Sequence, residues 1–447
     1  MTSALQRFLN VRRGEVAPLL AAAFYFFCVL TSLMVMRPAR DAIGMESGLD
    51  AIRWLFIGTA LVTLAVNPMF GWLVSRFRRI VFITATYVFF ALSLVGFYLL
   101  IALAPDAVGE TSGRVFYVWY SVFNLFSTMV FWALMADRFT LEQSKRLFGV
   151  IAVGGTVGAI VGPWLASMLA EPLGAPALLL VAAAFLAVGV VAAWVVAWLQ
   201  PGRASVEAGD AAGARRSADD RAVIGGSGWD GIRAVFRSRY LLGISAYVML
   251  LTVVATFIYF TRLGMVAALG EDTDMRATVF AQIDLITQVA TLLLQFVVAG
   301  HLMKRLGVSV ALALLPVVVS LGFIGLALVS SFAALIVLDA TFRAIQRAIT
   351  RPARETLFTV VSREDKYKSK AFTDTFVYRG GDVVGAWTEG LLGRLGMALV
   401  GLASVAVPLA IAWGVLGLWL GRRQESMAAS RMAPVREDAP ATPLTLP

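Results

Sequence analysis

Apolar residues fill most of this chain in long uninterrupted runs rather than in the alternating patterns of half-buried helices or strands. A helix needs about 20 mostly apolar residues to cross a bilayer, because each residue adds only about 1.5 Å. By that measure the sequence predicts twelve spanning helices, six on either side of a polar central segment. The first six lie at 16–36, 53–75, 80–103, 115–136, 147–169 and 177–199. The second six lie at 240–261, 277–302, 308–330, 332–361, 371–394 and 397–420.

The polar segments divide the chain into four parts. Six-helix bundles at 1–199 and 240–420 are separated by a linker at 200–239 and followed by a tail at 421–447. The first part of the linker is rich in Gly, Ala and charged residues, which is typical of a flexible segment. Its last part, GWDGIRAVFRSR, places apolar residues on one side and predicts a helix lying on the membrane surface. We expect the tail beyond Arg423 to be disordered.

Two short motifs recur in both bundles. Residues 71–76 match 300–305 at an offset of 229 (300 − 71), and 154–159 match 380–386 at an offset of 226 (380 − 154), or 227 (386 − 159) after one inserted residue. The glycines at 154, 155, 158 and 162 of the fifth span predict close packing between helices, with contact to a ligand as the alternative. Two bundles repeated in parallel are a common transporter plan, with the substrate site between them near mid-membrane. The sequence therefore predicts an all-α integral membrane protein of two repeated six-helix bundles.

Composition and charge agree with this interpretation. Hydrophobic residues make up 59% and charged residues 15%, against about 25% charged in soluble domains. The net charge of +10 would suggest nucleic acid in a soluble chain. Here the basic residues cluster in short loops at alternate helix ends, so the positive-inside rule explains them better. That rule predicts a multi-pass protein with both termini in the cytoplasm, a lipid bilayer as its environment, and no nucleic-acid partner.

Residues that carry enzyme or metal chemistry are scarce. Cys28 is the single cysteine, which excludes an intrachain disulfide, and His301 is the single histidine. The sequence offers neither a nucleophile–base pair nor a cluster of metal ligands. We therefore expect no enzymatic activity, no metal and no cofactor. The hydrophobic run after the first basic residues is too long for a signal peptide, so no cleaved targeting segment is expected.

An arginine stripe is the main chemical anomaly of the apolar chain. Arg343, Arg347, Arg351 and Arg354 are four, four and three residues apart, which places them on one helical face. Such a face cannot contact lipid and must face protein or a water-filled cavity. Arginine binds phosphate through two hydrogen bonds and stays charged when desolvated, which favours a route for an anion. The alternatives are internal salt bridges, for example with Asp339, and snorkelling of the last two arginines to headgroups.

Further polar residues are candidate ligands. Arg37 and Arg40 flank Pro38 at the outer end of the first predicted span, where a bent helix end would turn both side chains inward. The alternative is an anchor at the outer interface. Tyr120 and Asn124, one turn apart in the fourth span, would offer a hydroxyl and an amide to a ligand. Polar residues at this spacing also join helices to one another.

Four residues are candidates for coupling or gating. Asp284 lies in the eighth span, and desolvation would keep an unpaired carboxyl there protonated, as a proton-coupling group requires. The alternative for Asp284 is an ion pair with an arginine of the cavity. Asp382 and Glu389 share a face of the eleventh span, with Arg379 close enough in sequence to neutralise Asp382. A purely structural role is the alternative for these residues.

Several motifs resemble a known family. The G-x-L-x-x-R loop after the second and eighth spans resembles the loop signature of the major facilitator superfamily, with Ser75 in place of the usual acid. Further stretches resemble the ATP/ADP translocase (NTP/NDP exchange) family of plastids and intracellular bacteria, and more closely its bacterial branch. These stretches are MRPARD at 36–41, FWALMAD at 131–137 leading to KRLF at 145–148, RPAR at 351–354, and KSKAF at 368–372 leading to RGGD at 379–382.

The resemblance implies a carrier with a basic cavity, in a bacterial inner membrane. Arg40, Arg343 and Arg354 stand where those carriers have lysine or arginine. The chain departs from them in lacking glutamates in the fourth and seventh spans, and in having Asp382 where they have lysine. Transport of an anion fits these departures better than transport of a nucleotide.

The sequence therefore predicts a secondary active transporter that moves a small anionic, phosphorylated solute by alternating access, with a proton as the candidate coupling ion. The alternatives are ATP/ADP exchange and a membrane sensor or scaffold that does not transport. The predicted substrate-binding residues are Arg37, Arg40, Tyr120, Asn124, Arg343, Arg347 and Arg354. The predicted coupling and gating residues are Asp284, Arg379, Asp382 and Glu389.

Overall fold

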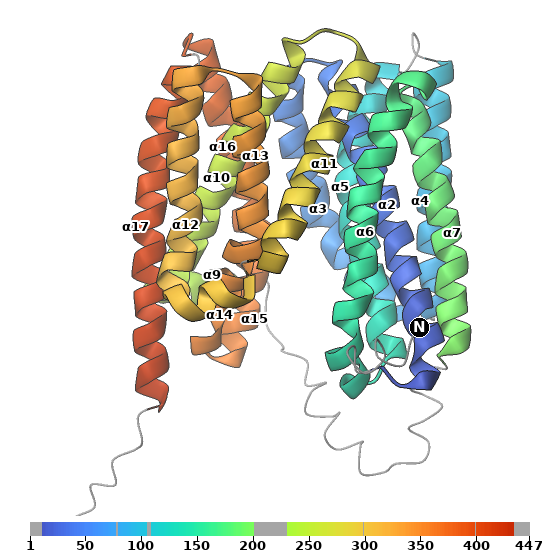
Figure 1. The fold of residues 1–447 in the computed structure, drawn as a ribbon, viewed down its shortest axis with the longest axis horizontal. Helices are drawn as coiled ribbons and strands as arrows, with labels where there is room; N and C mark the ends of the chain where they lie inside the picture. The colour runs from blue at the N-terminus through green and yellow to red at the C-terminus, as the bar shows by residue number, and fades with distance from the viewer. Residues whose placement is uncertain are drawn as a thin grey trace, which may run out of the picture.

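The computed structural model describes residues 11–76, 79–104, 109–200, 230–297, 299–397 and 399–432. These residues are almost entirely helical and contain no strand. The part of the linker that is predicted to be flexible and the end of the tail lie outside them. The helices form two groups, the first half and the second half, which stand side by side (Figure 1). We call the side that carries the N-terminus the lower side, as in Figure 1, and the opposite side the upper side.

The first half contains six long helices in chain order. They are α2 (Val16–Met45), α3 (Leu49–Arg76), α4 (Arg79–Leu103), α5 (Glu110–Arg138), α6 (Leu141–Leu173) and α7 (Leu178–Leu199), with short 3₁₀ turns η1 (Arg13–Glu15) and η3 (Ala175–Ala177). The second half opens with a short helix, α9 (Asp230–Arg237), where the sequence predicts a surface helix. Its first three long helices are α10 (Arg239–Ala267), α11 (Thr273–Val297) and α12 (Ala299–Val329), the last of which is broken at Gly307 with φ 73°.

The last three predicted spans of the second half contain more irregular structure. The tenth consists of α13 (Phe332–Ile345), a π-helical turn η6 (Gln346–Thr350), α14 (Arg351–Leu357) and a 3₁₀ turn η7 (Phe358–Val360). The eleventh consists of α15 (Arg363–Phe372), a π-helical turn η8 (Thr373–Val377) and α16 (Tyr378–Arg394). The twelfth is α17 (Leu399–Met432). The predicted order of twelve helical stretches is thus confirmed for the described residues.

Ten of the described helices are long and apolar enough to cross a membrane by length and composition. The two remaining stretches, 332–357 and 363–394, are divided by the π-helical turns and carry many of the charged residues discussed below. Those charges lower the hydropathy of the very helices that carry the arginine stripe.

Two predicted boundaries are wrong. Helix α2 continues to Met45, so Arg37, Pro38 and Arg40 lie inside the helix and not at a bent end. Proline removes one helical hydrogen bond, but Pro38 and its neighbour Ala39 are buried, and tertiary packing here outweighs the local cost. Helix α17 continues to Met432, beyond the point at which a disordered tail was expected.

The repeated glycines bring equivalent helices of the two halves into close contact. A Cβ at Gly154 of α6 would overlap the backbone carbonyl of Ala23 in α2. A Cβ at Gly385 of α16 would lie 2.9 Å from the carbonyl oxygen of Val253 in α10. The first and fifth spans of each half therefore pack in the same way, which confirms the interpretation of these glycines as packing residues.

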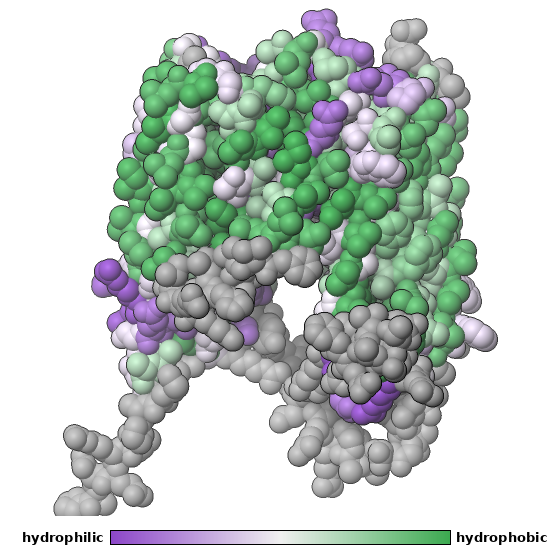
Figure 2. Space-filling view, viewed as in Figure 1, coloured by the Kyte–Doolittle hydropathy of each residue, from purple (hydrophilic) through white to green (hydrophobic). Residues whose placement is uncertain are grey.

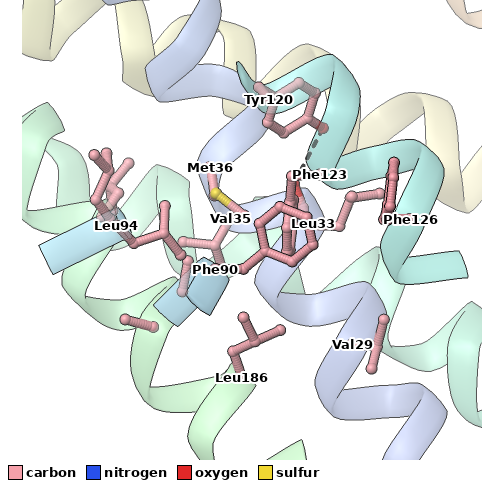
Figure 3. Close-up of a cluster of buried hydrophobic side chains, with 14 of the residues drawn as sticks. Val29, Leu33, Val35, Met36, Phe90, Leu94, Tyr120, Phe123, Phe126 and Leu186 are labelled. Carbon is pink, nitrogen blue, oxygen red and sulfur yellow. Dashed lines mark hydrogen bonds between the residues drawn. The ribbon is translucent and has the colours of Figure 1, made fainter. Parts of the chain in front are cut away.

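Each half has an apolar core of its own. Figure 3 shows part of the core of the first half, where Leu33, Phe90 and Phe123 pack between α2, α4 and α5. Phe260 of α10 and Phe280 of α11 also belong to this core, so the second half adds to it from the upper parts of two helices. The halves separate toward the lower side, and Figure 2 shows an opening between them there. The structure is thus sealed above and open below.

Candidate functional site

A cavity of about 800 Å³ lies between the two halves. Helices α2, α3 and α5 line it from the first half, and α10, α13, α14 and α16 with both π-helical turns line it from the second. Seven arginines and three aspartates are among its lining residues, a formal balance of +4. They are Arg37, Arg40, Arg343, Arg347, Arg351, Arg354 and Arg379, with Asp339, Asp374 and Asp382.

The structure brings most of the predicted residues to this cavity. All seven predicted substrate-binding residues line it, together with Arg379 and Asp382. Asp284 lies behind the wall and is 2% exposed, and Glu389 lies outside the cavity. The arginine stripe faces the cavity through all four of its members, as expected from the cost of placing arginine against lipid.

Arg40 occupies an aromatic and acidic corner of the cavity. Its guanidinium lies 4.5 Å from the ring centre of Tyr117 and 5.0 Å from that of Tyr120, both in α5. It pairs with the neighbouring carboxylate of Asp41 and donates to the hydroxyl of Tyr259 at 3.3 Å. Cation–π contact and an ion pair together hold the guanidinium in one orientation.

The two polar residues predicted on α5 differ in what they present. The Tyr120 hydroxyl donates to the carbonyl of Leu33 at 3.2 Å and is fully buried (Figure 3). This bond joins α5 to α2, which is the alternative that the sequence left open for Tyr120, and the Tyr120 side chain also lines the cavity. Asn124 is exposed in the cavity, and its side-chain amide makes no hydrogen bond to the described residues. Its amide is therefore accessible to a solute.

A buried ion network closes the cavity above. Arg262 of α10 has no exposed surface and lies 3.0 Å from Asp41, 3.5 Å from Asp284 and 3.7 Å from Asp339. These carboxylates come from α2, α11 and α13, so the network ties both halves together. Several partners per ion offset the large cost of desolvating each charge.

Arg343 belongs to the same network. Its Nε and Nη2 donate to both oxygens of Asp339 at 2.8 and 2.7 Å, and its Nη1 donates to Asp284 at 2.6 Å. Arg343 is 7% exposed. For this residue the structure has the salt bridges that were the alternative to substrate binding, because two carboxylates already occupy its donors.

Asp284 has three ion-pair partners. Arg343 lies at 2.6 Å, and Arg37 and Arg262 each lie at 3.5 Å. The premise of an unpaired carboxyl is therefore wrong, and the ion pair that the sequence left as an alternative is present. Asp284 is therefore held by three guanidiniums in this state.

In the lower part of the cavity, the arginine charges have fewer carboxylate partners than in the network above. Arg354 lies 3.2 Å from Asp374, and Arg379 lies 3.3 Å from Asp382. Arg347 donates to the side-chain oxygen of Gln288 and has no carboxylate within 4 Å among the described residues. Arg351 is exposed and has no polar partner in the described part of the chain. Two guanidiniums thus keep their full charge toward the cavity.

Glu389 forms part of a second contact between the halves. It accepts a hydrogen bond from Arg53 of α3 at 2.7 Å, and Arg53 also pairs with Asp50. A Cβ at Gly390 would lie less than 3 Å from the Arg53 guanidinium carbon, so glycine leaves room for this side chain. Beside it, the rings of Trp54 and Trp387 meet edge to face at 4.9 Å. These residues join α3 to α16 near their upper ends.

The sequence interpretation missed several network residues. Arg262 was placed just beyond the seventh predicted span, whereas α10 continues to Ala267 and carries the arginine inside it. A lone arginine in an apolar run is itself a signal of a functional or paired charge. Asp41 and Tyr259 gave no such signal, because their contacts join helices that are far apart in the sequence.

Comparisons with known proteins agree with this architecture. The sequence profile of the Major Facilitator Superfamily matches residues 19–345. Among curated protein sequences, none matches the chain. The resemblance to ATP/ADP translocases therefore stays a prediction.

Solved structures of transporters superpose on nearly the whole chain. The nucleoside transporter NupG has a TM-score of 0.60 at 13% identity, covering 92% of this chain and 98% of its own. A POT family transporter in complex with a thioalcohol-conjugated peptide has a TM-score of 0.62 at 12% identity, with coverage of 92% and 96%. A bacterial homologue of the human lysosomal transporter Spinster, inward-facing and unoccupied, has a TM-score of 0.55 at 15% identity, with coverage of 94% and 98%. At these identities the likeness shows the fold alone.

Proposed function

The chain belongs to the major facilitator superfamily, and on that premise we propose that it carries a small anionic, phosphorylated solute across the membrane by alternating access. The observation that supports an anion is the charge of the cavity, where seven arginines face three aspartates. Arg347 and Arg351 have no carboxylate partner among the described residues, so a bound anion would supply the missing countercharge.

The size and chemistry of the cavity support a phosphorylated metabolite. Ligand sites of about 300–1,000 Å³ hold molecules of metabolite size, and this cavity measures about 800 Å³. Guanidinium groups match phosphate oxygens in geometry, and several of them converge here. The rings of Tyr117 and Tyr120 and the amide of Asn124 supply apolar and hydrogen-bonding surface for the rest of the solute.

In an alternating-access cycle, the observed conformation corresponds to a state that is closed on the upper side and open on the lower side. The contacts of Arg262 and Arg53 close the upper side, while the halves diverge below. We assign the lower side to the cytoplasm of a bacterial inner membrane, because the basic loops of the sequence gather on that side. Both termini are then cytoplasmic, and the conformation is inward-facing, like that in which the Spinster homologue was solved.

A proton is the proposed coupling ion, and Asp382 is its best carrier. Asp382 lines the cavity and has Arg379 as its partner at 3.3 Å, whereas Asp284 is shared by three arginines. A proton carrier must release its ion-pair partner in the transport cycle, and Asp382 has one such partner among the described residues whereas Asp284 has three. Glu389 and its Arg53 partner serve as a gate, because their bond must break when the upper side opens.

Transport by purified protein in liposomes tests this proposal. Uptake of inorganic phosphate, a sugar phosphate, ADP and ATP is compared with uptake of a neutral nucleoside and a dipeptide. We expect a phosphorylated anion to be taken up, and Arg354→Gln to reduce its kcat/KM by about tenfold or more, as expected for a charged hydrogen bond. Arg114→Gln is the matched control, because Arg114 is an exposed arginine outside the cavity.

The other outcomes separate the alternatives. Exchange of labelled ATP against ADP would favour the nucleotide antiporter that the translocase resemblance implies. Uptake of neutral solutes alone would overturn the assignment of an anion. Folded protein that moves none of these solutes would favour a sensor or scaffold with the same fold.

A further inference from the structure

Arg37 and Arg347 both contact helix α11 at the boundary between the halves. Arg37 belongs to α2 of the first half, and its Nε lies 3.5 Å from the Oδ2 of Asp284. Arg347 belongs to η6 of the second half and donates from Nη1 to the side-chain oxygen of Gln288. Asp284 and Gln288 are one turn apart on α11, so both arginines rest against the same helical face. Gln288 also donates to the sulfur of Met34 at 3.6 Å, one turn before Arg37.

Neither arginine is fully neutralised by the protein. Arg347 has an amide and no carboxylate as its partner in the described part of the chain. Among the described residues, the one carboxylate within 4 Å of Arg37 is that of Asp284, which is already bound more closely by Arg343 at 2.6 Å. The Nε of Arg37 is too far from it for a good hydrogen bond. Both side chains line the cavity, so their remaining donors are accessible to a solute.

We propose that one anionic group of the solute binds between Arg37 and Arg347 and so bridges the two halves. This inference rests on the proposed function and specifies where its charged group is held. The group is an oxyanion such as a phosphoryl group, because two guanidiniums from opposite sides need several acceptor oxygens. Arg351 lies one turn below Arg347 and contacts a different part of the solute.

Because Arg37 and Arg347 belong to opposite halves, binding of an anion between them affects how close the two halves lie. Without a bound anion, two like charges from opposite halves lie against the same face of α11, and their repulsion favours separation of the halves. A bound anion replaces that repulsion with two attractions that involve both halves. The solute therefore stabilises conformations in which the halves are close together around it.

Anion binding to the full-length protein in detergent tests the site. Inorganic phosphate is titrated while the thermal unfolding midpoint is recorded, with chloride at equal ionic strength as the reference. We expect Arg37→Gln and Arg347→Gln each to weaken the apparent affinity for phosphate by about 10- to 100-fold. Arg114→Gln, outside the cavity, leaves the affinity unchanged. Unchanged phosphate affinity in both cavity variants overturns the proposed site.

A variant with a tethered anion provides the sharper test. Arg347→Glu places a carboxylate beside Arg37, where the solute's own anionic group would lie. Without phosphate, we expect Arg347→Glu to unfold at a higher temperature than Arg347→Gln, and its midpoint to stop responding to phosphate. A midpoint below that of Arg347→Gln contradicts a bridging anion.

Transport distinguishes a failure of this site from a failure of the proposed function. If liposomes take up a phosphorylated solute while Arg37→Gln and Arg347→Gln keep the wild-type KM, the site is wrong and the function stands. If the wild-type protein neither binds phosphate nor transports any anion, both are overturned.

Discussion

The four arginines of the stripe lie on one helical face but have four different surroundings. Arg343 is saturated by Asp339 and Asp284, and Arg354 is paired with Asp374. Arg347 has an amide partner, and Arg351 lines the cavity with no polar partner in the described residues. A charge is available to a ligand when no carboxylate has already taken its donors, so the free arginines of the stripe are Arg347 and Arg351.

Arg262 offers a prediction at the scale of the residue. Arg262→Met removes the fully buried cation that three aspartates share, and we expect about 3–5 kcal/mol of destabilisation, the usual cost of leaving buried partners unpaired. Chemical unfolding in detergent measures it. Arg233→Met, at an exposed position of α9, is the control and should stay within about 0.5 kcal/mol of wild type. Adding Asp41→Asn to Arg262→Met should recover part of the loss, and equal stability of Arg262→Met and the control would refute the network's role.

At the scale of the element, two features adapt the helices to the cavity: π-helical turns and closely packed glycines. The π-helical turns η6 and η8 lie in the two stretches that carry most of the cavity's charges, and both turns line the cavity. A π turn inserts an extra residue and alters the direction of the side chains that follow, which is why such turns are frequent at functional sites. Glycines on α6 and α16 leave the helices regular and allow them to approach α2 and α10 closely.

The α2–α6 contact gives a prediction at this scale. Gly154→Ala forces a methyl group against the backbone of Ala23, which cannot rotate away, so we expect a loss of about 1–3 kcal/mol. Gly149→Ala is the matched control on the same helix, where a Cβ meets open space. It should be neutral or stabilising by up to about 1 kcal/mol, because alanine favours the helix. Thermal unfolding of the two variants in parallel gives the comparison, and equal midpoints would show that the contact is not tight.

At the scale of the whole molecule, the two halves are held together on one side. Apolar side chains of α10 and α11 join the core of the first half, and the Arg262 and Arg53 contacts add ion pairs across the boundary. Opening the upper side would separate Asp41 from Arg262 but leave Asp41 with Arg40 in its own half. Arg262 would likewise keep Asp284 and Asp339. Asp41, Arg262, Asp284 and Asp339 would thus each keep a partner, which lowers the electrostatic cost of opening.

The Arg53–Glu389 bond leads to a prediction for the equilibrium between conformations open on the lower side and conformations open on the upper side. In a Cys28→Ala background, Asn124→Cys places a single thiol in the cavity, where a membrane-impermeant maleimide labels it from the lower side. Adding Glu389→Gln weakens a bond between the halves, and we expect labelling from the upper side to rise several-fold.

Glu110→Gln is the control for that experiment. It removes an exposed ion pair with Arg114 near the upper end of α5, within one half. Its labelling should match that of the parent protein. Equal labelling of the Glu389→Gln and Glu110→Gln variants would show that the Arg53–Glu389 bond does not hold the upper side closed.

Much of the architecture is determined by local features of the sequence. The length of each apolar run determines the twelve helical stretches, and the 3.6-residue period places the arginine stripe on one face. The glycines of the fifth span predicted close helix packing, because the packing of small residues is also a local property. These conclusions need no knowledge of which helices are neighbours.

Only the tertiary structure decided which charges are free. Asp41, Asp284 and Asp339 come from three helices that are distant in the sequence, and their convergence on Arg262 is not encoded in any local spacing. That convergence neutralises Arg343, which the sequence favoured as a ligand, and leaves Arg347 with its charge available. The reason is physical: a helical period determines the direction in which a side chain points, whereas the partner that meets it depends on the packing of the other helices.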